Sequence, residues 1–410
     1  MASGKELPTD KTRYDIAELS IALVSGLALA ITALFLCVAP LTGGIAGVRD
    51  FVVYWATGQQ LVHQANPYDP AAMMKIERDA GLPAGYGVLY MRNPPWALPV
   101  AYPLGLTGVR VGTLLWSLVL LACLWASVRL TWQIQGRPRR LLNSLGLSFA
   151  PALMCLIVGQ TSLFALLGLV LFLTFHRTRP FLAGMSLWLC ALKPHLFLAF
   201  GVVLLAWIAV NGAYKVLLGA AAALAASCAV TWCIDPTAWA DYARMMRTVG
   251  IEREFIPCWS VALRLWLSPR VMSLQYLLPA LASAWALAYF WKRRHTWDWL
   301  SHGNLVVLVS IVAAPYCWLF DQSIAIPALL QGAYRTRSRA MLALLAAASV
   351  LIEIELFRGV KLPSGLFLWT APTWLAWYLL AARLGTAPTW LAWYLLAARS
   401  TAETTGSEGK

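Results

Sequence analysis

The sequence predicts an all-α, polytopic membrane protein, and its composition, its apolar runs and its loop charges support that prediction. Sixty per cent of the 410 residues are hydrophobic, only 12% are charged, and the mean hydropathy is +0.66. A soluble domain needs about a quarter of its residues charged to cover its surface. The apolar runs are repeatedly long enough to cross ~30 Å of hydrocarbon. Short alternating strand patterns, which mark a membrane β-barrel, are absent from the sequence.

About twelve transmembrane helices are expected from these runs. The N-terminal segment, residues 1–15, contains no cleavage signal, so the first run is expected to be a retained helix and not a signal peptide. Several runs are short for a complete crossing, which leaves one pair of spans open to reassignment. In chain order, the expected spans are Ile16–Ala39, Val109–Trp132, Leu142–Val158, Ser162–Phe175, Phe181–Leu192, His195–Val210, Tyr214–Cys233, Val271–Trp291, Leu305–Leu319, Gln322–Ala333, Ala340–Leu356 and Leu366–Ala382.

The basic residues test this arrangement, because Lys and Arg accumulate in the short cytoplasmic connections of membrane proteins. If the N-terminus is cytoplasmic, alternate connections should be basic, and all of them are. These connections carry Arg137, Arg139 and Arg140; Arg177 and Arg179; Lys215; Lys292, Arg293 and Arg294; and Arg335, Arg337 and Arg339. The same bias accounts for the net charge of +14 and disfavours nucleic acid as a partner. We expect a multi-pass protein of the cell inner (plasma) membrane.

The opposite face is expected to carry two long loops, at about residues 40–108 and 234–270, and most of the carboxylates. The first loop contains NPPWALPVAYPLG, whose four prolines prevent a regular span. Its Trp96 and Tyr102 suit the headgroup layer. The second loop combines aromatic and charged residues, which is typical of helices that lie along a membrane interface.

The eight cysteines predict neither a zinc site nor a disulfide framework. They are scattered, mostly within apolar runs, and the sequence shows neither CxxC nor Cys/His ligand spacing. We interpret them as small hydrophobic side chains, and we expect no metal and no cofactor.

A tandem duplication lies near the C-terminus. TAPTWLAWYLLAAR occurs at Thr370–Arg383 and again at Thr386–Arg399. Two copies do not make a solenoid, which needs three or more stacked units. The second copy is too short to span a membrane reliably. We expect residues 384–410 to form an amphipathic or frayed tail at the cytoplasmic surface.

Four polar clusters lie at the ends of expected spans, all on the non-cytoplasmic face. Ionisable groups at membrane depth are costly, so each is a functional candidate. The clusters are Arg49-Asp50, Gln160 in VGQTS, Lys193 and His195 in ALKPHLF, and Asp321 in APYCWLFDQS. Each cluster also has a purely structural explanation. Arg49-Asp50 could cap a helix and contact a headgroup, and Gln160 could belong to a tight turn. Lys193 could extend to the interface, and Asp321 could neutralise a neighbouring arginine. Their convergence on one face predicts a single site.

The residues at this face favour glycosyl transfer from a lipid phosphate. A Gly-rich loop followed by Lys-Ser/Thr is missing, which disfavours a nucleotide-driven pump. A Gly-x-Ser-x-Gly nucleophile elbow is also missing. An aspartate can take a proton from an attacking sugar hydroxyl, and Lys or Arg can stabilise a departing phosphate.

Five blocks resemble glycosyltransferase family 87: RDFVVYWATGQQLVHQANPYDP, NPPWALPVAYPL, GQTSLFALLGLVL, LKPHLFLAF and APYCWLFDQSIAIPALL. Their order and spacing cover roughly residues 15–335, and the first block is the most specific. The resemblance implies the GT-C fold for residues 16–383, a polyprenyl-phosphate-sugar donor, often of mannose, and inverting transfer on the extracytoplasmic face. A lipid or glycan acceptor and membrane lipids are the other implied partners.

The resemblance also implies roles for individual residues. Asp50 matches the general base, and Arg49, Tyr54 and Tyr68 would line the donor or acceptor cleft. Gln160, Lys193, His195 and Asp321 match the polar ends of later blocks, with Lys193 the preferred phosphate contact. The chain departs from some members of the family, which carry a histidine near the block where this chain has Asp321.

The expected mechanism is a direct, metal-independent displacement at the anomeric carbon. Asp50 would deprotonate the acceptor hydroxyl, while Lys193 and an arginine of the second loop, Arg253 or Arg264, hold the phosphate. Two alternatives remain open from the sequence. A transporter or flippase of lipid-linked sugars should show two related halves with broken helices. A non-enzymatic envelope assembly protein should tolerate replacement of Asp50.

Overall fold

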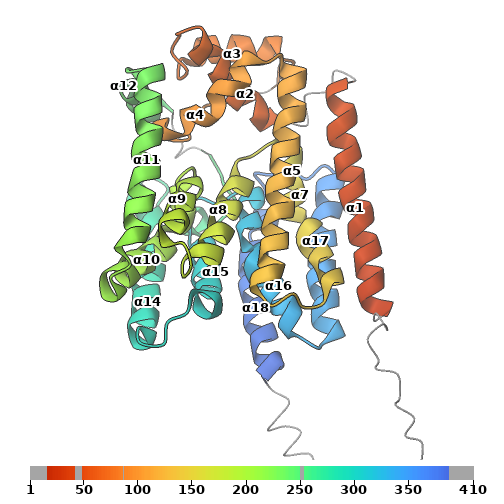
Figure 1. The fold of residues 1–410 in the computed structure, drawn as a ribbon. Coiled ribbons are helices and arrows are strands. Elements are labelled where there is room, and N and C mark those ends of the chain that lie inside the picture. Colours follow the sequence, from red (N-terminus) through yellow and green to blue (C-terminus); the bar gives the residue numbers. More distant parts are fainter. Residues whose placement is uncertain (1–15, 42–48, 86, 250–253, 387–410) are drawn as a thin grey trace, which may run out of the picture.

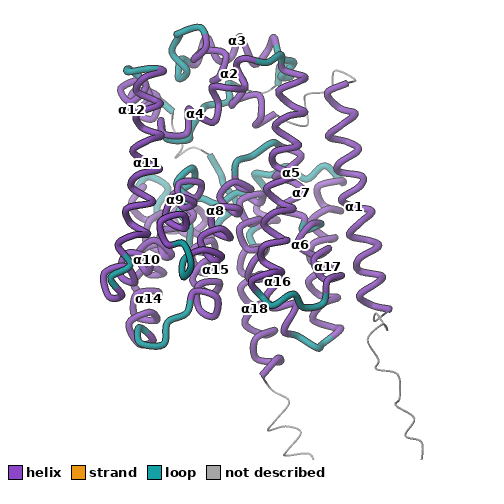
Figure 2. Tube along the Cα trace, viewed as in Figure 1, coloured by secondary structure: helices purple, strands orange, loops and turns teal. Residues whose placement is uncertain are grey.

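The computed structural model describes residues 16–41, 49–85, 87–249 and 254–386, and every regular element in these ranges is a helix (Figures 1 and 2). The all-α fold class is therefore confirmed. The second copy of the duplicated segment, apart from its first residue Thr386, and the N-terminal residues 1–15 lie outside the described ranges. The first copy forms most of α18 (Thr370–Thr386).

Among the described residues, six helices are long and apolar enough to cross a membrane, not the expected twelve. A seventh span results if the bent pair Arg140–Leu147 and Ala150–Val158, which meet at 48°, is counted as one. The six are Glu18–Val38 in α1 (Ile16–Leu41), α5 (Val109–Ile134), Pro194–Asn211 with α10 (Leu198–Asn211), α11 (Tyr214–Ile234), α17 (Arg339–Phe357), and Gly365–Ala382 with α18.

The expected count is wrong because several apolar runs form helices that are too short. At 1.5 Å per residue, the 14 residues of α8 (Ser162–Phe175) rise only about 21 Å, against the ~30 Å of a hydrocarbon core. The other short helices are α7 (Ala150–Val158), α9 (Pro180–Cys190), α14 (Leu277–Arg293), α15 (Asn304–Val312) and α16 (Ile326–Arg335). Polar turns separate these short helices. An apolar run of the sequence therefore ends before its helix is long enough to cross a membrane.

The two long loops form a cap at one end of the bundle (Figure 1). The first contributes α2 (Arg49–Val62), α3 (Pro70–Asp79) and α4 (Leu98–Ala101), with short 3-10 turns η2 (Pro95–Ala97) and η3 (Tyr102–Leu106). The second contributes α12 (Ala238–Thr248), α13 (Trp259–Leu267) and the turn η7 (Met272–Tyr276).

Aromatic contacts join the two halves of the cap. The rings of Trp96 and Trp239 lie 6.0 Å apart, and the ring of Tyr68 meets that of Tyr242 edge-on at 5.5 Å. The first loop therefore packs on the second, although the contacting residues are 140 residues or more apart in the chain.

Basic connections meet at the opposite end of the bundle. Arg139 forms a 2.8 Å ion pair with Glu18 at the start of α1, and its guanidinium donates to the carbonyls of Ala333 and Thr336, at 2.8 and 2.6 Å. Arg177 forms a 2.7 Å ion pair with Asp298 in the connection from α14 to α15.

The remaining short helical elements are η4 (Arg140–Leu142), α6 (Asn143–Leu147), η5 (Pro194–Phe197), the π-turn η8 (Trp299–Gly303), η9 (Leu319–Ala325) and η10 (Gly365–Phe367).

Two glycines set the position of α2, and therefore of Asp50. A Cβ built on Gly105 in η3 would lie 2.1 Å from the carbonyl oxygen of Gly58 in α2, and one on Gly58 would lie 2.3 Å from the carbonyl oxygen of Ala101. The close approach lets Gln59 donate its amide N–H to the carbonyl of Gly105 at 2.8 Å. Only residues without a Cβ allow the two backbones to come this near.

We predict that Gly105→Ala destabilises the cap by about 1–3 kcal/mol, because the added methyl group must force α2 and η3 apart. Thermal unfolding of the purified protein in detergent measures the loss. Gly26→Ala in α1 is the control, since no atom lies within 4 Å of its added Cβ. Equal unfolding temperatures for the two variants would contradict the prediction.

Candidate functional site

The turn between α7 and α8 is the centre of the candidate site. α7 ends at Gly159, which adopts the left-handed conformation with φ +78°. This conformation reverses the chain and exposes Gln160 while its backbone N–H still bonds to the carbonyl of Cys155 at 3.0 Å. The indole of Trp116 on α5 donates to the carbonyl of Gly159 at 2.8 Å, which ties the turn to a long helix.

On one side of this turn, Gln160 contacts the cap. Its Nε2 donates to Oδ2 of Asp50 at 2.9 Å, and its Oε1 accepts from the hydroxyl of Tyr54 at 3.2 Å. Asp50 and Tyr54 are four residues apart in α2, so their side chains lie on the same helix face. Tyr54 is 4% exposed, whereas Asp50 is half-buried.

On the other side, Ser162 belongs to a buried charged cluster. Nζ of Lys193 lies 2.7 Å from Oδ1 of Asp321 and 3.0 Å from Oγ of Ser162, and Ser162 donates to the same Oδ1 at 2.6 Å. The second oxygen of Asp321 accepts the backbone N–H of Trp318 at 2.9 Å. Lys193 and Asp321 are 7% and 1% exposed. Their opposite charges and shared hydroxyl offset the cost of removing both ions from water.

His195 extends the site toward the turn after α15. Its ring contacts that of Tyr316, with centroids 4.1 Å apart and the ring planes tilted by 35°. The first loop reaches the same segment, because the side chain of Asn93 donates to the carbonyl of Leu192 at 3.0 Å and the indole of Trp96 to that of Ala191 at 2.9 Å. The NPPW block therefore lies against the KPH block.

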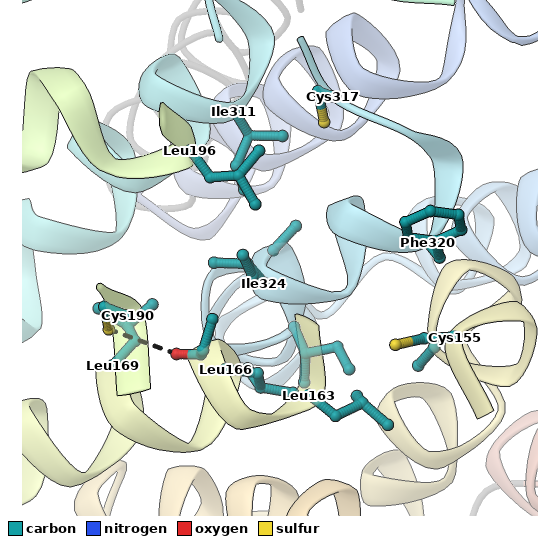
Figure 3. Close-up of a cluster of buried hydrophobic side chains, with 14 of the residues drawn as sticks. Cys155, Leu163, Leu166, Leu169, Cys190, Leu196, Ile311, Cys317, Phe320 and Ile324 are labelled. Atoms are coloured by element: carbon teal, nitrogen blue, oxygen red, sulfur yellow. Dashed lines mark hydrogen bonds between the residues drawn. The ribbon is translucent and has the colours of Figure 1, made fainter. Parts of the chain in front are cut away.

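Apolar side chains of the short helices form the floor of the polar cluster. Figure 3 shows Leu163 and Leu166 of α8 together with Leu196, Ile311 and Ile324 from three other elements. All five are buried. Leu163 directly follows Ser162, and Phe320, which is also drawn, directly precedes Asp321. The charged groups thus lie on a packed apolar base that holds their geometry.

The structure thus brings residues from all four predicted clusters together, through Asp50, Gln160, Lys193, His195 and Asp321. The other predicted residues are less directly placed. Tyr68 is 4% exposed and lies in the cap against Tyr242. Arg264 is 1% exposed, and its Nη1 donates to the carbonyl of Pro269 at 2.9 Å, which joins α13 to η7. Arg253 and the side chain of Arg49 lie outside the described residues.

Sequence analysis missed two parts of this region. Ser162 stood inside the VGQTS block but was not assigned to the site. Arg92 and Glu254 form a two-bonded ion pair between the two cap loops, in which Nη1 of Arg92 donates to Oε2 of Glu254 at 2.7 Å. The position of Arg92 directly before the NPPW block was the one available signal.

In the described part of the chain, no three His, Cys, Asp or Glu side chains are grouped so that they could hold a metal ion.

Glu77 in α3 is a buried carboxyl group that, unlike Asp321, has no cation paired with it by a salt bridge among the described residues. It is fully buried, its Oε2 accepts the N–H of Leu89 at 3.0 Å, and burial raises its pKa from 4.5 to about 7.

We predict that Lys193→Met costs about 3–5 kcal/mol of stability, because it leaves the carboxylate of Asp321 buried and unpaired. The double variant Lys193→Met/Asp321→Asn should lose less than the sum of the two single losses, since it removes both charges. Thermal unfolding in detergent measures all three variants, and Lys292→Met, at an exposed lysine, is the control. Strict additivity would contradict the coupling.

We predict that Glu77 destabilises the fold as the pH rises. Its folded pKa lies above the unfolded value, so between about pH 4.5 and 7 the folded state binds more protons, and stability falls across that window. Relative to wild type, Glu77→Gln should gain on the order of 1–3 kcal/mol between pH 5 and pH 8. Asp79→Asn, at an exposed carboxylate of the same helix, should show no such gain in the same unfolding series.

The comparisons with known proteins identify the family. The model of glycosyltransferase family 87 matches residues 90–318, more than half of the chain. The match includes Gln160, Lys193 and His195, and it begins after Asp50. No curated protein and no solved structure matches the chain. The sequence match and the helical, membrane-type fold agree, and the chain belongs to glycosyltransferase family 87, as a membrane glycosyltransferase.

Proposed function

We propose that the protein moves a hexose, mannose being the first candidate, from a polyprenyl-phosphate donor to a lipid or glycan acceptor. Transfer takes place at the capped end of the bundle and inverts the anomeric centre. Asp50 is the general base. One observation carries the proposal: the turn between α7 and α8 bonds to Asp50 through Gln160 and to the Lys193–Asp321 pair through Ser162.

Burial separates the roles of the two aspartates. Asp321 is 1% exposed, and both of its oxygens already accept hydrogen bonds, from Lys193, Ser162 and the N–H of Trp318. Asp50 is half-buried and lies at the start of the cap helix. A general base must come within hydrogen-bond reach of the proton it removes. This requirement favours Asp50 as the base and Asp321 as a positioning residue.

The donor phosphate requires cations, and two are near the site. Lys193 bonds to Asp321 and Ser162, and an ammonium group has a third N–H to offer. Arg92 carries a guanidinium whose partner, Glu254, is 42% exposed. An ion pair this exposed is worth only about 0–1 kcal/mol, so an incoming phosphate can replace the carboxylate of Glu254. We therefore add Arg92 to Lys193 as a phosphate contact, in preference to Arg264.

The proposed step is a single displacement. The acceptor oxygen attacks the anomeric carbon from the face opposite the phosphate, and its proton passes to the carboxylate of Asp50. The bond between the anomeric carbon and the phosphate oxygen breaks, and polyprenyl phosphate leaves with the electron pair. Lys193 and Arg92 stabilise the charge that grows on this phosphate. Phosphate is already a good leaving group, so the proposal requires no metal.

The capped end is proposed to face away from the cytoplasm. The support is the position of the basic connections, which meet at the other end of the bundle through Arg139 and Arg177. Cytoplasmic connections are enriched in Lys and Arg.

A sugar-transfer assay tests the proposal. Purified protein in lipid receives radiolabelled polyprenyl-phosphate-mannose, a panel of lipid and glycan acceptors, and EDTA in a parallel series. We expect Asp50→Asn to lower kcat by at least about a hundredfold, the usual range for loss of a general base. Asp79→Asn should keep wild-type activity, and Arg92→Gln should mainly raise the KM for the donor.

Monodisperse elution and an unchanged unfolding temperature establish that the variants are folded. Full activity in Asp50→Asn would remove this residue from the mechanism. Absence of transfer by wild type to every acceptor would refute the proposed donor. Loss of activity in EDTA, restored by a divalent ion, would refute metal independence.

A further inference from the structure

A cavity of about 480 Å³ lies at the end of the bundle opposite the cap. Its walls come from the connections between α8 and α9, between α10 and α11, and between α14 and α15. Figure 1 shows the last two of these at the lower end, away from α2–α4 and α12. None of the residues assigned to sugar transfer lines the cavity, so it needs a separate explanation.

The side chains at this cavity favour an anion. Arg177 and Lys215 contribute two positive charges, and Asp298 is the one carboxylate among the lining residues. Asp298 already pairs with Arg177 at 2.7 Å and accepts the N–H and the hydroxyl of Ser301, at 3.1 and 2.8 Å. Helix ends of both polarities meet here, because α8 and α10 end where α9 and α11 begin. The dipoles of these helix ends oppose one another, so the charges of the lining side chains determine whether the cavity favours an anion.

Two tryptophans form part of the wall of the cavity. Trp297 and Trp299 line the cavity, with rings 5.5 Å apart, and neither indole N–H has an acceptor among the described residues. Trp299 is 1% exposed. An indole N–H is donor only, as are the ammonium and guanidinium groups. Both indole nitrogens are shielded from the open cavity, so the charged donors that it presents to a ligand are those of Arg177 and Lys215.

The position of the cavity indicates where such a ligand comes from. Tyr214 begins α11 beside it and is 58% exposed, and Trp291, near the end of α14, is 54% exposed. Aromatic side chains at helix ends are typical of the headgroup layer of a bilayer. The cavity thus adjoins the kind of aromatic and basic side chains that are typical of this layer.

We propose that this cavity binds the phosphate of an anionic phospholipid from the leaflet on the basic side of the protein. Arg177 and Lys215 hold the phosphate oxygens, and the tryptophans form the wall against the glycerol region. The site is separate from sugar transfer and does not depend on the proposed donor.

Lipid binding to the purified full-length protein tests the assignment. The protein in detergent is titrated with dioleoyl phosphatidylglycerol or dioleoyl phosphatidylcholine, and bound lipid is counted by native mass spectrometry. Four proteins are compared: wild type, Arg177→Gln/Lys215→Gln, Arg335→Gln/Arg337→Gln, and Ala213→Phe. The third removes the same charge from the same end of the bundle, outside the cavity. The fourth keeps the charges and places a bulky ring in the cavity.

We expect wild type and Arg335→Gln/Arg337→Gln to prefer phosphatidylglycerol at least tenfold. Arg177→Gln/Lys215→Gln and Ala213→Phe should lose that preference while keeping their unfolding temperature. Retention of the preference in both cavity variants would overturn the proposal, as would its absence in wild type. Inorganic phosphate forms a separate arm: if it raises the unfolding temperature of wild type alone and no lipid preference exists, the cavity takes a soluble phosphate and the lipid assignment is wrong.

Discussion

The buried ion pair between Lys193 and Asp321 is the interaction on which the centre of this protein depends. Each charge alone would be prohibitively costly at 7% and 1% exposure. Paired at 2.7 Å and bridged by the hydroxyl of Ser162, they join the end of α9, the start of α8 and the turn η9. These segments are far apart in sequence, and each is too short to be fixed by a membrane crossing of its own. The pair therefore adds directional contacts between these segments to the apolar packing beneath them.

The cap depends on that centre in turn. α2 is held from above by its glycine contact with η3 and from below by the bonds of Asp50 and Tyr54 to Gln160. The first loop also bonds to the carbonyls of Ala191 and Leu192, immediately before Lys193. A displacement of the ion pair would thus reach Asp50 through Ser162 and Gln160, which belong to the same turn between α7 and α8. The family match from residue 90 to 318 covers Ser162 and Lys193, but it includes neither α2 nor Asp321.

The sequence predicted the helical class, the location of the basic connections at one end of the bundle and the grouping of the polar clusters. These follow from composition and from charge, which are local properties of the chain. It overestimated the number of spans, because hydropathy reports that a run such as Ser162–Phe175 is apolar, not that its two ends are turned back inside the protein. It also missed Arg92 with Glu254, a pair separated by 162 residues that only the packing of two loops creates. Its charge made Arg264 a predicted phosphate contact, whereas its guanidinium donates to the carbonyl of Pro269, five residues further along the chain.

The amide of Gln160 has a consequence for the order of events in a reaction cycle. Its nitrogen faces Asp50 and its oxygen faces the hydroxyl of Tyr54, so the amide cannot rotate by half a turn without placing its oxygen against the carboxylate and its nitrogen against Tyr54. This orientation suits an ionised Asp50, which only accepts hydrogen bonds. An Asp50 that has gained a proton at Oδ2 meets the donor of Gln160 with a donor of its own. In the proposed mechanism, this bond favours the ionised form of Asp50, so the carboxyl group would release its proton before the next acceptor hydroxyl is deprotonated.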